Sequence, residues 1–476
     1  MLNEDFSTWR CRKHEISLAR PRIMGILNVT PDSFSDGGED VDADAAIARG
    51  LRMLDEGATI IDVGGESTRP GHTPVDSKEE ARRVVPVIRG LVEQGAIVSL
   101  DTRHADLAKM CIRLGVSIIN DVTGFTDPAM AEVAAESGCG CVVVHWTDPS
   151  AGRARRSVQL DPSRQVQQRP VPSSQRFTLP DEMPVMRQVM GFLGDQARTL
   201  VRAGVDRQCI CVDPGPGFDK TVDQDVIIQR ATKKICSMGY PVLCAPSRKR
   251  FVGAVSGVRE AAERDAATAG VVLAAVSAGA RIVRVHDVAT AAQAINSYWN
   301  MTCSDPRRAY ISLGSNVGDR LRYLADATRL IDKLPLTCVS GVSHAYETDP
   351  AYGIATPVAN AVVEIRTELA PLVLLDELLA IEDKLGRVRK EGEEGHGPRT
   401  IDCDLAWMEG EAHAGRKLTL PHPHLGERDY VIVPMEDLMY DPVRFLAHSG
   451  VTVLEPERRV GHVRSDLGPV EWEDLS

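Results

Sequence analysis

Aromatic residues and long hydrophobic runs are both scarce in this sequence. Phenylalanine, tryptophan and tyrosine make up 4% of its 476 residues. No apolar stretch approaches the length of about 20 residues that a membrane-spanning helix requires, and residues 1–20 are too charged for a signal peptide. We therefore expect a chain with no membrane partner.

Positive charge is in deficit, because 55 Lys and Arg residues face 67 Asp and Glu residues and give a formal net charge of -12. A protein that binds nucleic acid usually carries a basic surplus, so we expect no nucleic-acid partner. The content of 43% hydrophobic and 26% charged residues is that of an ordinary globular protein. It excludes wholesale disorder.

Cysteine pairs of the CxxC type are also missing, although the sequence has 11 cysteines. Cys139, Cys141, Cys209, Cys211 and Cys244 lie inside apolar runs, where a free thiol behaves as a small hydrophobic side chain. Disulfide frameworks are typical of small secreted domains. The pattern predicts buried free thiols and a cytoplasmic location.

One pattern is repeated between residues 22 and 288: a short apolar run ends in a polar residue, and a loop and a helix-like stretch follow. The runs cover residues 23–27, 59–63, 97–100, 117–119, 141–144, 209–212, 241–244 and 281–285. Continuous apolar strands that alternate with helices predict a parallel sheet covered on both faces. Eight such units predict an α/β fold of the TIM (β/α)8 barrel type. A doubly wound open sheet is the alternative.

Polar residues follow most of these runs, at the carboxyl ends of the strands, where barrels of this type carry their functional groups. A single Asp or Asn at such a position is explained as a turn former or a helix cap. Carboxylates, amides and basic groups from most of the strands are harder to explain in this way, and they predict a shared polar pocket. Residues 147–185 interrupt the pattern and are interpreted as a long surface loop.

Seven motifs at these strand ends resemble, in order, the signatures of the dihydropteroate synthases. They cover residues 24–38, 65–71, 101–102, 119–121, 213–215, 247–251 and 284–288. The resemblance implies a barrel that condenses a pterin diphosphate with p-aminobenzoate, giving 7,8-dihydropteroate and pyrophosphate. Catalysis would rest mainly on stabilising the departing charge and aligning the amine.

The same resemblance implies roles for individual residues. The pterin ring would be held by Asp101, Asn120, Asp213 and Lys249. The pyrophosphate would be bound by Asn28, Thr68, Arg69, Arg284 and His286, with Asn28 as a ligand of Mg²⁺. The aminobenzoate would lie against Pro70, Phe218 and Ser247.

A second pattern follows the barrel, as expected for a chain too long for one hydrophobic core. Strands are predicted at residues 310–313, 337–348, 358–365 and 400–407, and helices at residues 319–334, 371–385 and 427–438. This βαββαβ order predicts a smaller, ferredoxin-like α+β domain. We place the barrel domain at residues 1–300, a linker at 301–308 and the second domain at 309–476.

Asp402 and Asp404 alternate on the last of these strands, so both carboxylates face the same side. Paired carboxylates are suitable ligands for Mg²⁺ on a nucleotide triphosphate. A solvated surface strand with alternating acids would explain the same pair. Nearby arginines, suited to binding phosphate oxygens, favour the metal site.

Motifs in this domain resemble those of hydroxymethyl-dihydropterin pyrophosphokinase. They cover residues 314–316, 346–348, 385–389, 397–404 and 420–423. The resemblance implies that two Mg²⁺ ions are bound by Asp402 and Asp404, and that Arg387 and Arg399 hold the transferring group. It implies ATP as co-substrate, bound by Arg389, Lys417, His422 and Arg428. The pterin would be bound by Asn360 and Tyr430.

The two resemblances support each other, because the product of the kinase is the pterin substrate of the synthase. We predict an enzyme of folate biosynthesis whose partners are hydroxymethyl-dihydropterin, p-aminobenzoate and ATP. Synthases of this family are commonly dimers, so the resemblance also implies a homodimer through the barrel domain. Three alternatives stay open: a pterin-dependent methyltransferase-like barrel, an active synthase with a degenerate kinase domain, or a pterin-binding scaffold.

Overall fold

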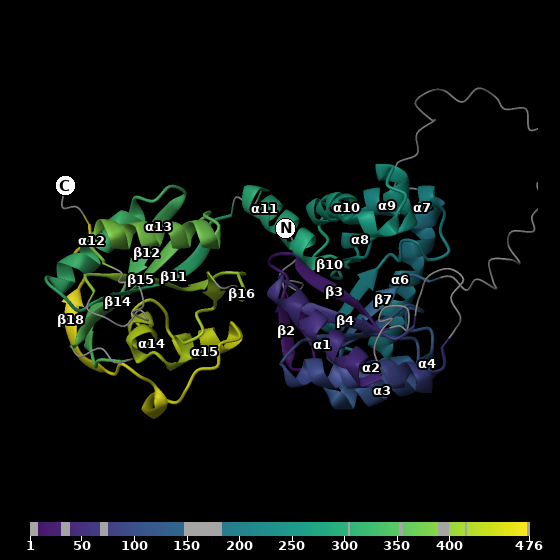
Figure 1. Cartoon of the computed structure of the whole chain (residues 1–476), viewed down its shortest axis with the longest axis horizontal. Coiled ribbons are helices and arrows are strands. Elements are labelled where there is room, and N and C mark those ends of the chain that lie inside the picture. Colours follow the sequence, from purple (N-terminus) through teal and green to yellow (C-terminus); the bar gives the residue numbers. More distant parts are fainter. Residues whose placement is uncertain are drawn as a thin grey trace, which may run out of the picture. The chain divides into compact units, whose positions relative to one another are not determined.

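The computed structural model describes residues 8–29, 39–66, 75–146, 183–302, 305–351, 356–388, 399–414 and 417–473. The chain divides into two units, Met1–Tyr298 and Trp299–Ser476. Each is described by itself (Figure 1). Most of the predicted surface loop at residues 147–185 lies outside the described residues.

The first unit is built on one sheet of eight parallel strands. They are β3 (Arg22–Asn28), β4 (Ile60–Gly64), β5 (Val98–Asp101), β6 (Ile118–Asp121), β7 (Gly140–Val144), β8 (Ile210–Asp213), β9 (Leu243–Cys244) and β10 (Ile282–Val285). The strand order is β8-β7-β6-β5-β4-β3-β10-β9. A parallel bridge between Val212 and Val242 joins the two ends of this order. The predicted barrel is confirmed.

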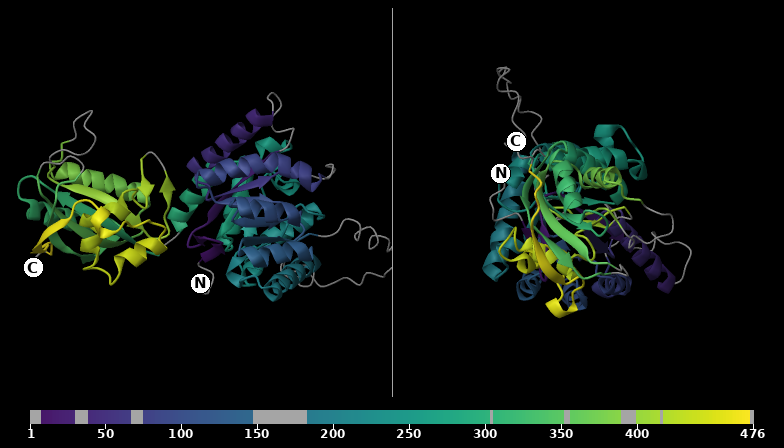
Figure 2. Two further views of the ribbon diagram at one scale, coloured as in Figure 1. Left: turned by 90° about the horizontal axis from the view of Figure 1, so that it is seen from below. Right: turned by 90° about the vertical axis from the view of Figure 1, so that its left-hand side faces the viewer.

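Helices surround these strands, as Figures 1 and 2 show. They are α1 (Glu39–Asp55), α2 (Ser77–Glu93), α3 (Ala105–Leu114), α4 (Pro128–Ser137), α6 (Pro184–Ala203), α7 (Val222–Arg230), α8 (Thr232–Cys236), α9 (Arg250–Ser256), α10 (Asp265–Ser277) and α11 (Val288–Thr302). Every residue of β4, β6, β7 and β8 is buried. Burial on both faces explains why these strands are continuous apolar runs.

A hairpin that the sequence analysis did not predict packs against the amino-terminal end of the barrel. It consists of β1 (Thr8–Cys11) and β2 (His14–Ser17). Trp9 is fully buried, and its indole Nε1 donates a hydrogen bond to the carbonyl of Cys209, at 2.9 Å. Cys11 lies so close to Gly140 that a Cβ there would be 2.5 Å from its Sγ. The hairpin therefore closes the hydrophobic core at the amino-terminal ends of the strands.

The second unit contains an antiparallel sheet. Its strands are β11 (Arg307–Ser315), β12 (Thr337–Val342), β13 (His344–Thr348), β14 (Val358–Thr367), β15 (Asp402–Met408) and β18 (Val463–Pro469). The order is β15-β11-β14-β13-β18, and β12 also pairs with β14. The four predicted strands thus occur in the order 4-1-3-2, which is that of a ferredoxin-like sheet. The predicted strand at residues 337–348 is interrupted at Ser343, whose Oγ accepts a hydrogen bond from Val362 N at 2.8 Å.

Helices cover both faces of this sheet (Figure 1). On one face α12 (Arg320–Asp332) and α13 (Pro371–Lys384) pack over Ile311 and Leu313. On the other, α14 (Asp429–Met435) and α15 (Pro442–His448) pack with Tyr310 and Trp407. Side chains of β11 alternate between the two cores because successive residues of a strand point to opposite faces. The shorter elements are β16 (His413–Ala414) and β17 (Thr419–Leu420).

No helix within the described ranges is both long and apolar enough to cross a bilayer.

Replacing Trp9 with alanine should lower the free energy of unfolding by about 3–5 kcal/mol, because it removes a fully buried aromatic side chain and leaves a cavity. Urea unfolding followed by circular dichroism, with separate transitions for the two units, measures the change. Met110→Ala on α3, where the side chain is 47% exposed, is the control and should cost less than about 1 kcal/mol. Equal effects of the two variants would show that the hairpin is not part of the core.

Two candidate active sites

The carboxyl ends of the barrel strands form the mouth of the barrel and bring together polar and charged side chains from β4, β5, β6 and β10. Arg284 donates from Nε to Asp62 Oδ2 at 2.6 Å and from Nη2 to Asp101 Oδ2 at 2.7 Å. Asn120 Nδ2 donates to the same Asp62 oxygen at 3.0 Å. Four strands are therefore connected by one hydrogen-bonded network. Three of its four members were predicted as site residues.

Asp62 is the member that the sequence analysis missed. It lies in the middle of β4, flanked by isoleucine and valine, and its side chain is fully buried. Its Oδ1 atom has no hydrogen-bond partner among the described residues. A single carboxylate inside an apolar run was the signal for it, since an unpaired buried charge is costly.

Asp213 and Lys249 lie near the same mouth, close enough for their charges to interact. Asp213 Oδ1 accepts a hydrogen bond from Gly215 N at 2.7 Å. Lys249 Nζ donates to the carbonyl of Pro216 and lies 4.8 Å from the centroid of the Phe218 ring. Burial raises the pKa of Asp213 and lowers that of Lys249, and the charge of each partly offsets the effect on the other.

Burial also raises the pKa of Asp101 to about 7; Asp62 and Asp121 add to the rise, and Arg284 opposes it. The mouth therefore contains carboxyl groups whose ionised form would be stabilised by hydrogen bonds from a ligand. A flat heterocycle with an edge of N–H groups supplies such donors.

The remaining predicted barrel residues are placed as follows. Ser247 Oγ lies 2.9 Å from His286 Nδ1, and His286 N donates to the same hydroxyl at 3.1 Å. Asn28 ends β3, in register with Gly64. Thr68, Arg69 and Pro70 lie outside the described residues.

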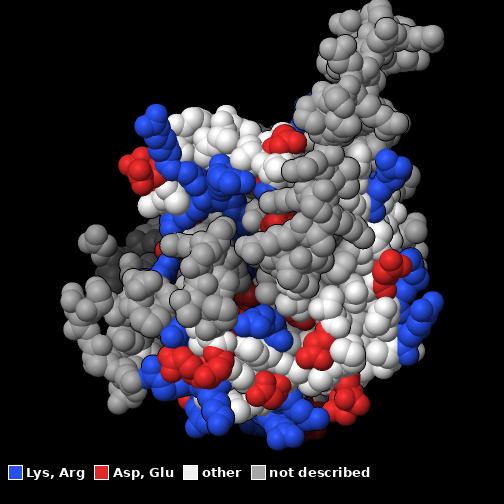
Figure 3. Space-filling view, turned by 90° about the vertical axis from the view of Figure 1, so that its right-hand side faces the viewer, with Lys and Arg blue, Asp and Glu red and all other residues white. Residues whose placement is uncertain are grey.

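A basic cavity of about 290 Å³ lies next to His286 and contains arginines that the sequence analysis did not select. It is lined by Arg49, Arg52, Met53, Glu56, Arg248, His286 and Asp287. The Arg248 guanidinium donates two hydrogen bonds to Asp265, at 2.8 and 2.6 Å. On the face in Figure 3, basic and acidic side chains are interspersed around the grey segments.

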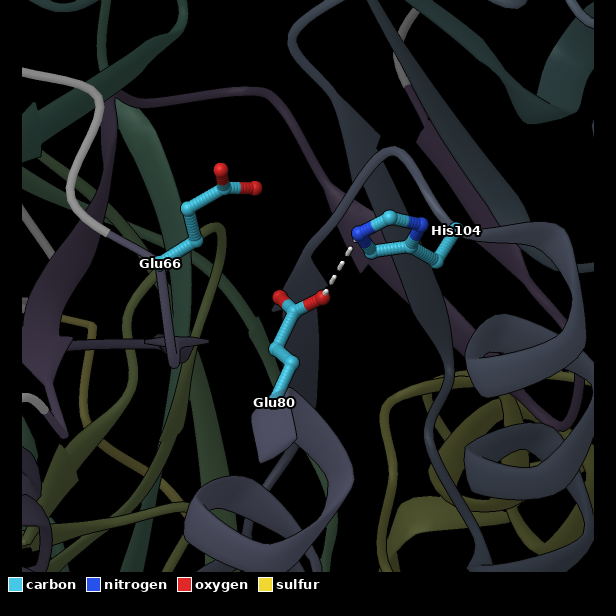
Figure 4. Close-up of side chains that lie close together, drawn as sticks. All are labelled: Glu66, Glu80 and His104. Atoms are coloured by element: carbon cyan, nitrogen blue, oxygen red, sulfur yellow. Dashed lines mark ion pairs between the residues drawn. The ribbon is translucent and has the colours of Figure 1, made fainter. Parts of the chain in front are cut away.

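A cluster of Glu66, Glu80 and His104 lies next to the end of β5 and contacts Thr102, the residue after this strand. Figure 4 shows Glu66, Glu80 and His104 pointing toward one another. Glu80 Oε2 accepts a hydrogen bond from Thr102 Oγ1 at 2.9 Å and lies 3.8 Å from His104 Nε2. The ligand atoms of the three lie within 4.8 Å of one another, but both oxygens of Glu66 already accept hydrogen bonds from Arg103, at 3.1 and 3.2 Å. We interpret the cluster as a support that fixes the residues next to Asp101.

The second unit has a pocket of about 200 Å³ over β11 and β15. It is lined by Ser312, Gly314, Asn360, Arg387, Arg399, Asp402, Asp404, His422, Arg428 and Tyr430. Asp402 and Asp404 lie opposite Gly314 and Ser312 in the antiparallel register. The small residues on β11 leave room above the two carboxylates.

Arginines surround the two carboxylates. Arg387 forms an ion pair with Asp402 and donates to Glu382 Oε1 at 2.6 Å. Arg399 Nη1 lies 3.0 Å from Asp402 Oδ2, and Arg428 Nη1 donates to Asp404 Oδ2 at 3.1 Å. Cationic groups around a pair of carboxylates can hold both a divalent metal and the phosphates bound to it.

Burial alters the titration of two residues in this pocket. It raises the pKa of Asp404, and the neighbouring Asp402 adds to the rise. Burial and the charge of Arg428 lower the pKa of His422 to about 4, so this imidazole is neutral at pH 7.

One predicted residue lies away from the pocket. Lys417 forms an exposed ion pair with Asp376, at 2.8 Å, and does not line the cavity. Arg389 lies outside the described residues. Asn360 lines the pocket, and its Nδ2 donates to Thr348 Oγ1 at 2.7 Å.

Known proteins resemble both parts of the chain. Residues 24–286 match the family model described as pterin binding enzyme, and residues 310–440 match that of 7,8-dihydro-6-hydroxymethylpterin-pyrophosphokinase. The dihydropteroate synthase of Mycobacterium leprae is 40% identical over 286 residues, which are 59% of this chain and 93% of that protein.

Solved structures agree with this match. The dihydropteroate synthase of Xanthomonas albilineans with 4-aminobenzoic acid is 34% identical, with a TM-score of 0.54, over 63% of this chain and 99% of that chain. The structure of the same enzyme in complex with 7,8-dihydropteroate is 32% identical, with a TM-score of 0.52, over 62% and 99% of the two chains.

The barrel, the α+β unit and the two matches define a transferase with two catalytic domains. The chain belongs to the pterin binding enzyme family, with a dihydropteroate synthase domain followed by a hydroxymethyl-dihydropterin pyrophosphokinase domain. Both domains belong to folate biosynthesis, so the predicted family, fold class and function are confirmed.

Glu80 gives this region a pH-dependent stability that can be measured. Burial raises its pKa from 4.5 to about 7, so between these values the folded state keeps a proton that the unfolded state has lost. The contribution of Glu80 is therefore greatest below pH 4.5 and falls, by up to about 3 kcal/mol, as the pH rises to 7. Denaturant unfolding at several pH values should show this fall for the natural chain relative to Glu80→Gln. Parallel pH profiles of the two proteins would contradict the prediction.

Proposed function

We propose that the chain catalyses both steps in succession. The second unit would transfer the pyrophosphoryl group of ATP to 6-hydroxymethyl-7,8-dihydropterin and release AMP. The barrel would then condense the resulting diphosphate with p-aminobenzoate. The observation that supports this best is that the predicted charged residues gather in each unit, with Arg284 bonded to Asp101 at the barrel mouth and Asp402, Asp404 and three arginines lining one pocket of the second unit.

In the barrel, the carboxylate of Asp213 would accept hydrogen bonds from the pterin edge, and Asn120 and Lys249 would bind its acceptor atoms. The C–O bond to pyrophosphate breaks as the amine nitrogen of p-aminobenzoate bonds to the pterin methylene carbon, and the nitrogen then loses a proton. Arg284 and His286 would stabilise the departing negative charge. Phe218 and Ser247 would contact the aminobenzoate. Mg²⁺, with Asn28 as a ligand, would supply further charge neutralisation.

In the second unit, Asp402 and Asp404 fit Mg²⁺ because they present paired hard oxygen ligands within one pocket. Bound Mg²⁺ would neutralise the triphosphate. Arg387 and Arg399 would align the transferring group, and Arg428 and the neutral His422 would bind ATP. Asn360 and Tyr430, which line the same pocket as Asp402 and Asp404, would bind the pterin.

The location and assembly of the chain complete the proposal. All cysteines in the described part of the chain are free, and most are buried. Unpaired thiols support a reducing compartment, the cytoplasm. Two copies would pair through the barrel domain, which light scattering of the purified chain would test.

The decisive test is one coupled assay with ATP, hydroxymethyl-dihydropterin and p-aminobenzoate. We expect formation of AMP, pyrophosphate and dihydropteroate. A chain with a degenerate kinase domain would make dihydropteroate only from supplied pterin diphosphate. A methyltransferase-like barrel would not release pyrophosphate when p-aminobenzoate is added.

Separate substitutions should abolish the two reactions independently. Asp404→Asn removes a proposed metal ligand and should lower AMP formation by at least about 1000-fold, while dihydropteroate formation from supplied diphosphate stays unchanged. Asp213→Asn should lower dihydropteroate formation from supplied diphosphate and leave AMP formation unchanged. Loss of both reactions in either variant, with circular dichroism unchanged, would contradict two independent sites.

Asp62 should be essential for the synthase although it was not recognised from the sequence. Asp62→Asn keeps the shape but removes the charge that pairs with Arg284, so kcat/KM for dihydropteroate formation should fall about 100-fold. Asp195→Asn, which removes the charge of a carboxylate that is 71% exposed and paired with Arg198, is the control and should retain full activity. Equal activity of the two variants would show that the Asp62 charge is dispensable.

A further inference from the structure

The chain continues beyond residue 440, where the match to the pyrophosphokinase family ends, and a later segment returns to the kinase pocket. This segment, residues 459–462, precedes β18. Its Val460 forms an isolated parallel bridge with Arg428. Val460 N donates to the carbonyl of Glu427 at 2.8 Å, and Asp429 N donates to the carbonyl of Val460 at 3.0 Å. The backbone on both sides of a pocket arginine is thereby fixed.

Two side chains of the segment contact a buried carboxylate beside the pocket. Asp429 lies between Arg428 and Tyr430 and is 9% exposed. Its Oδ1 lies 3.3 Å from Arg459 Nη1, and its Oδ2 lies 3.0 Å from His462 Nδ1. A buried carboxylate is stable only with such partners. The carboxylate at the start of α14 is therefore paired with Arg459 and contacted by His462.

Gly461 lies directly against the ring of Tyr430. A Cβ at Gly461 would be 2.4 Å from Tyr430 Cδ1 and 3.1 Å from Cε1, so no side chain fits without moving the ring. Gly461 also has a φ of +67, which favours glycine. Tyr430 lines the pocket, and the guanidinium of Arg428 lies 5.5 Å from the centroid of its ring.

We propose that residues 459–462 form a positioning segment for the pterin substrate of the kinase. The peptide backbone at Gly461 limits how far the Tyr430 ring can retreat from the pocket. The bridge at Val460 and the Arg459–Asp429 pair hold the helix start that carries the ring. The inference rests on the proposed kinase function, because it assigns the Tyr430 ring to contact with the pterin.

The test compares two glycine substitutions in the full chain. Gly461→Ala should push Tyr430 into the pocket and raise the KM for hydroxymethyl-dihydropterin about tenfold, the size of a lost aromatic contact. The kcat and the KM for ATP should stay within about threefold. Gly450→Ala is the matched control, because Gly450 has a φ of +81 but no atom within 4 Å of an added Cβ. It should keep the natural KM.

A double-mutant cycle shows whether the effect passes through the ring. In a Tyr430→Ala background, Gly461→Ala should change the pterin KM less than about twofold, because the group it displaces is gone. A full tenfold effect in that background would overturn the proposal. So would equal KM values for Gly461→Ala and Gly450→Ala in an otherwise active enzyme.

The outcomes separate this inference from the function on which it rests. If the natural chain forms no AMP, the proposed kinase function fails and the inference fails with it. If the natural chain is active and the glycine variants do not differ, only the inference fails. Should Gly461→Ala not fold, Arg459→Gln tests the same segment: it should raise the pterin KM, and Arg459→Lys should restore part of the affinity.

Discussion

Arg284 is the residue on which the geometry of the barrel mouth depends. It pairs with the carboxylates of Asp62 and Asp101, which lie on two neighbouring buried strands. The positive charge of Arg284 offsets part of the charge of both carboxylates, so the positions of the three side chains depend on one another. Through Asn120 the same constraint extends to a fourth strand. The ends of separate strands therefore act as one rigid surface.

The second unit uses the same balance of charge in a different fold. Asp402 and Asp404 are surrounded by arginines whose other faces point into the pocket region. Without a ligand, the opposite charges satisfy each other. In the proposed function, phosphates and Mg²⁺ would replace these partners with groups of the same charge, so binding would require no new uncompensated charge. Both sites can therefore be preformed, at a modest cost in reorganisation.

The sequence was sufficient for elements whose signal is local. Continuous apolar runs predicted every barrel strand because burial on both faces requires such runs. The β1–β2 hairpin was missed because its burial depends on a contact between Trp9 and Cys209, 200 residues apart. Asp62 was missed because it lies within the apolar run of a predicted strand and not at its end. Lys417 has the chemistry of a phosphate ligand, but the placement of its loop pairs it with Asp376.

The hairpin also has a consequence for how such a barrel can change. Trp9 and Cys11 contribute to the core at the opposite end of the strands from Asp101 and Asp213. The hairpin thus adds buried side chains at one end, whereas the residues proposed to recognise the substrate lie at the other. Substitutions among the polar residues at the carboxyl ends of the strands can therefore leave the packing of Trp9 and Cys11 at the opposite end unchanged.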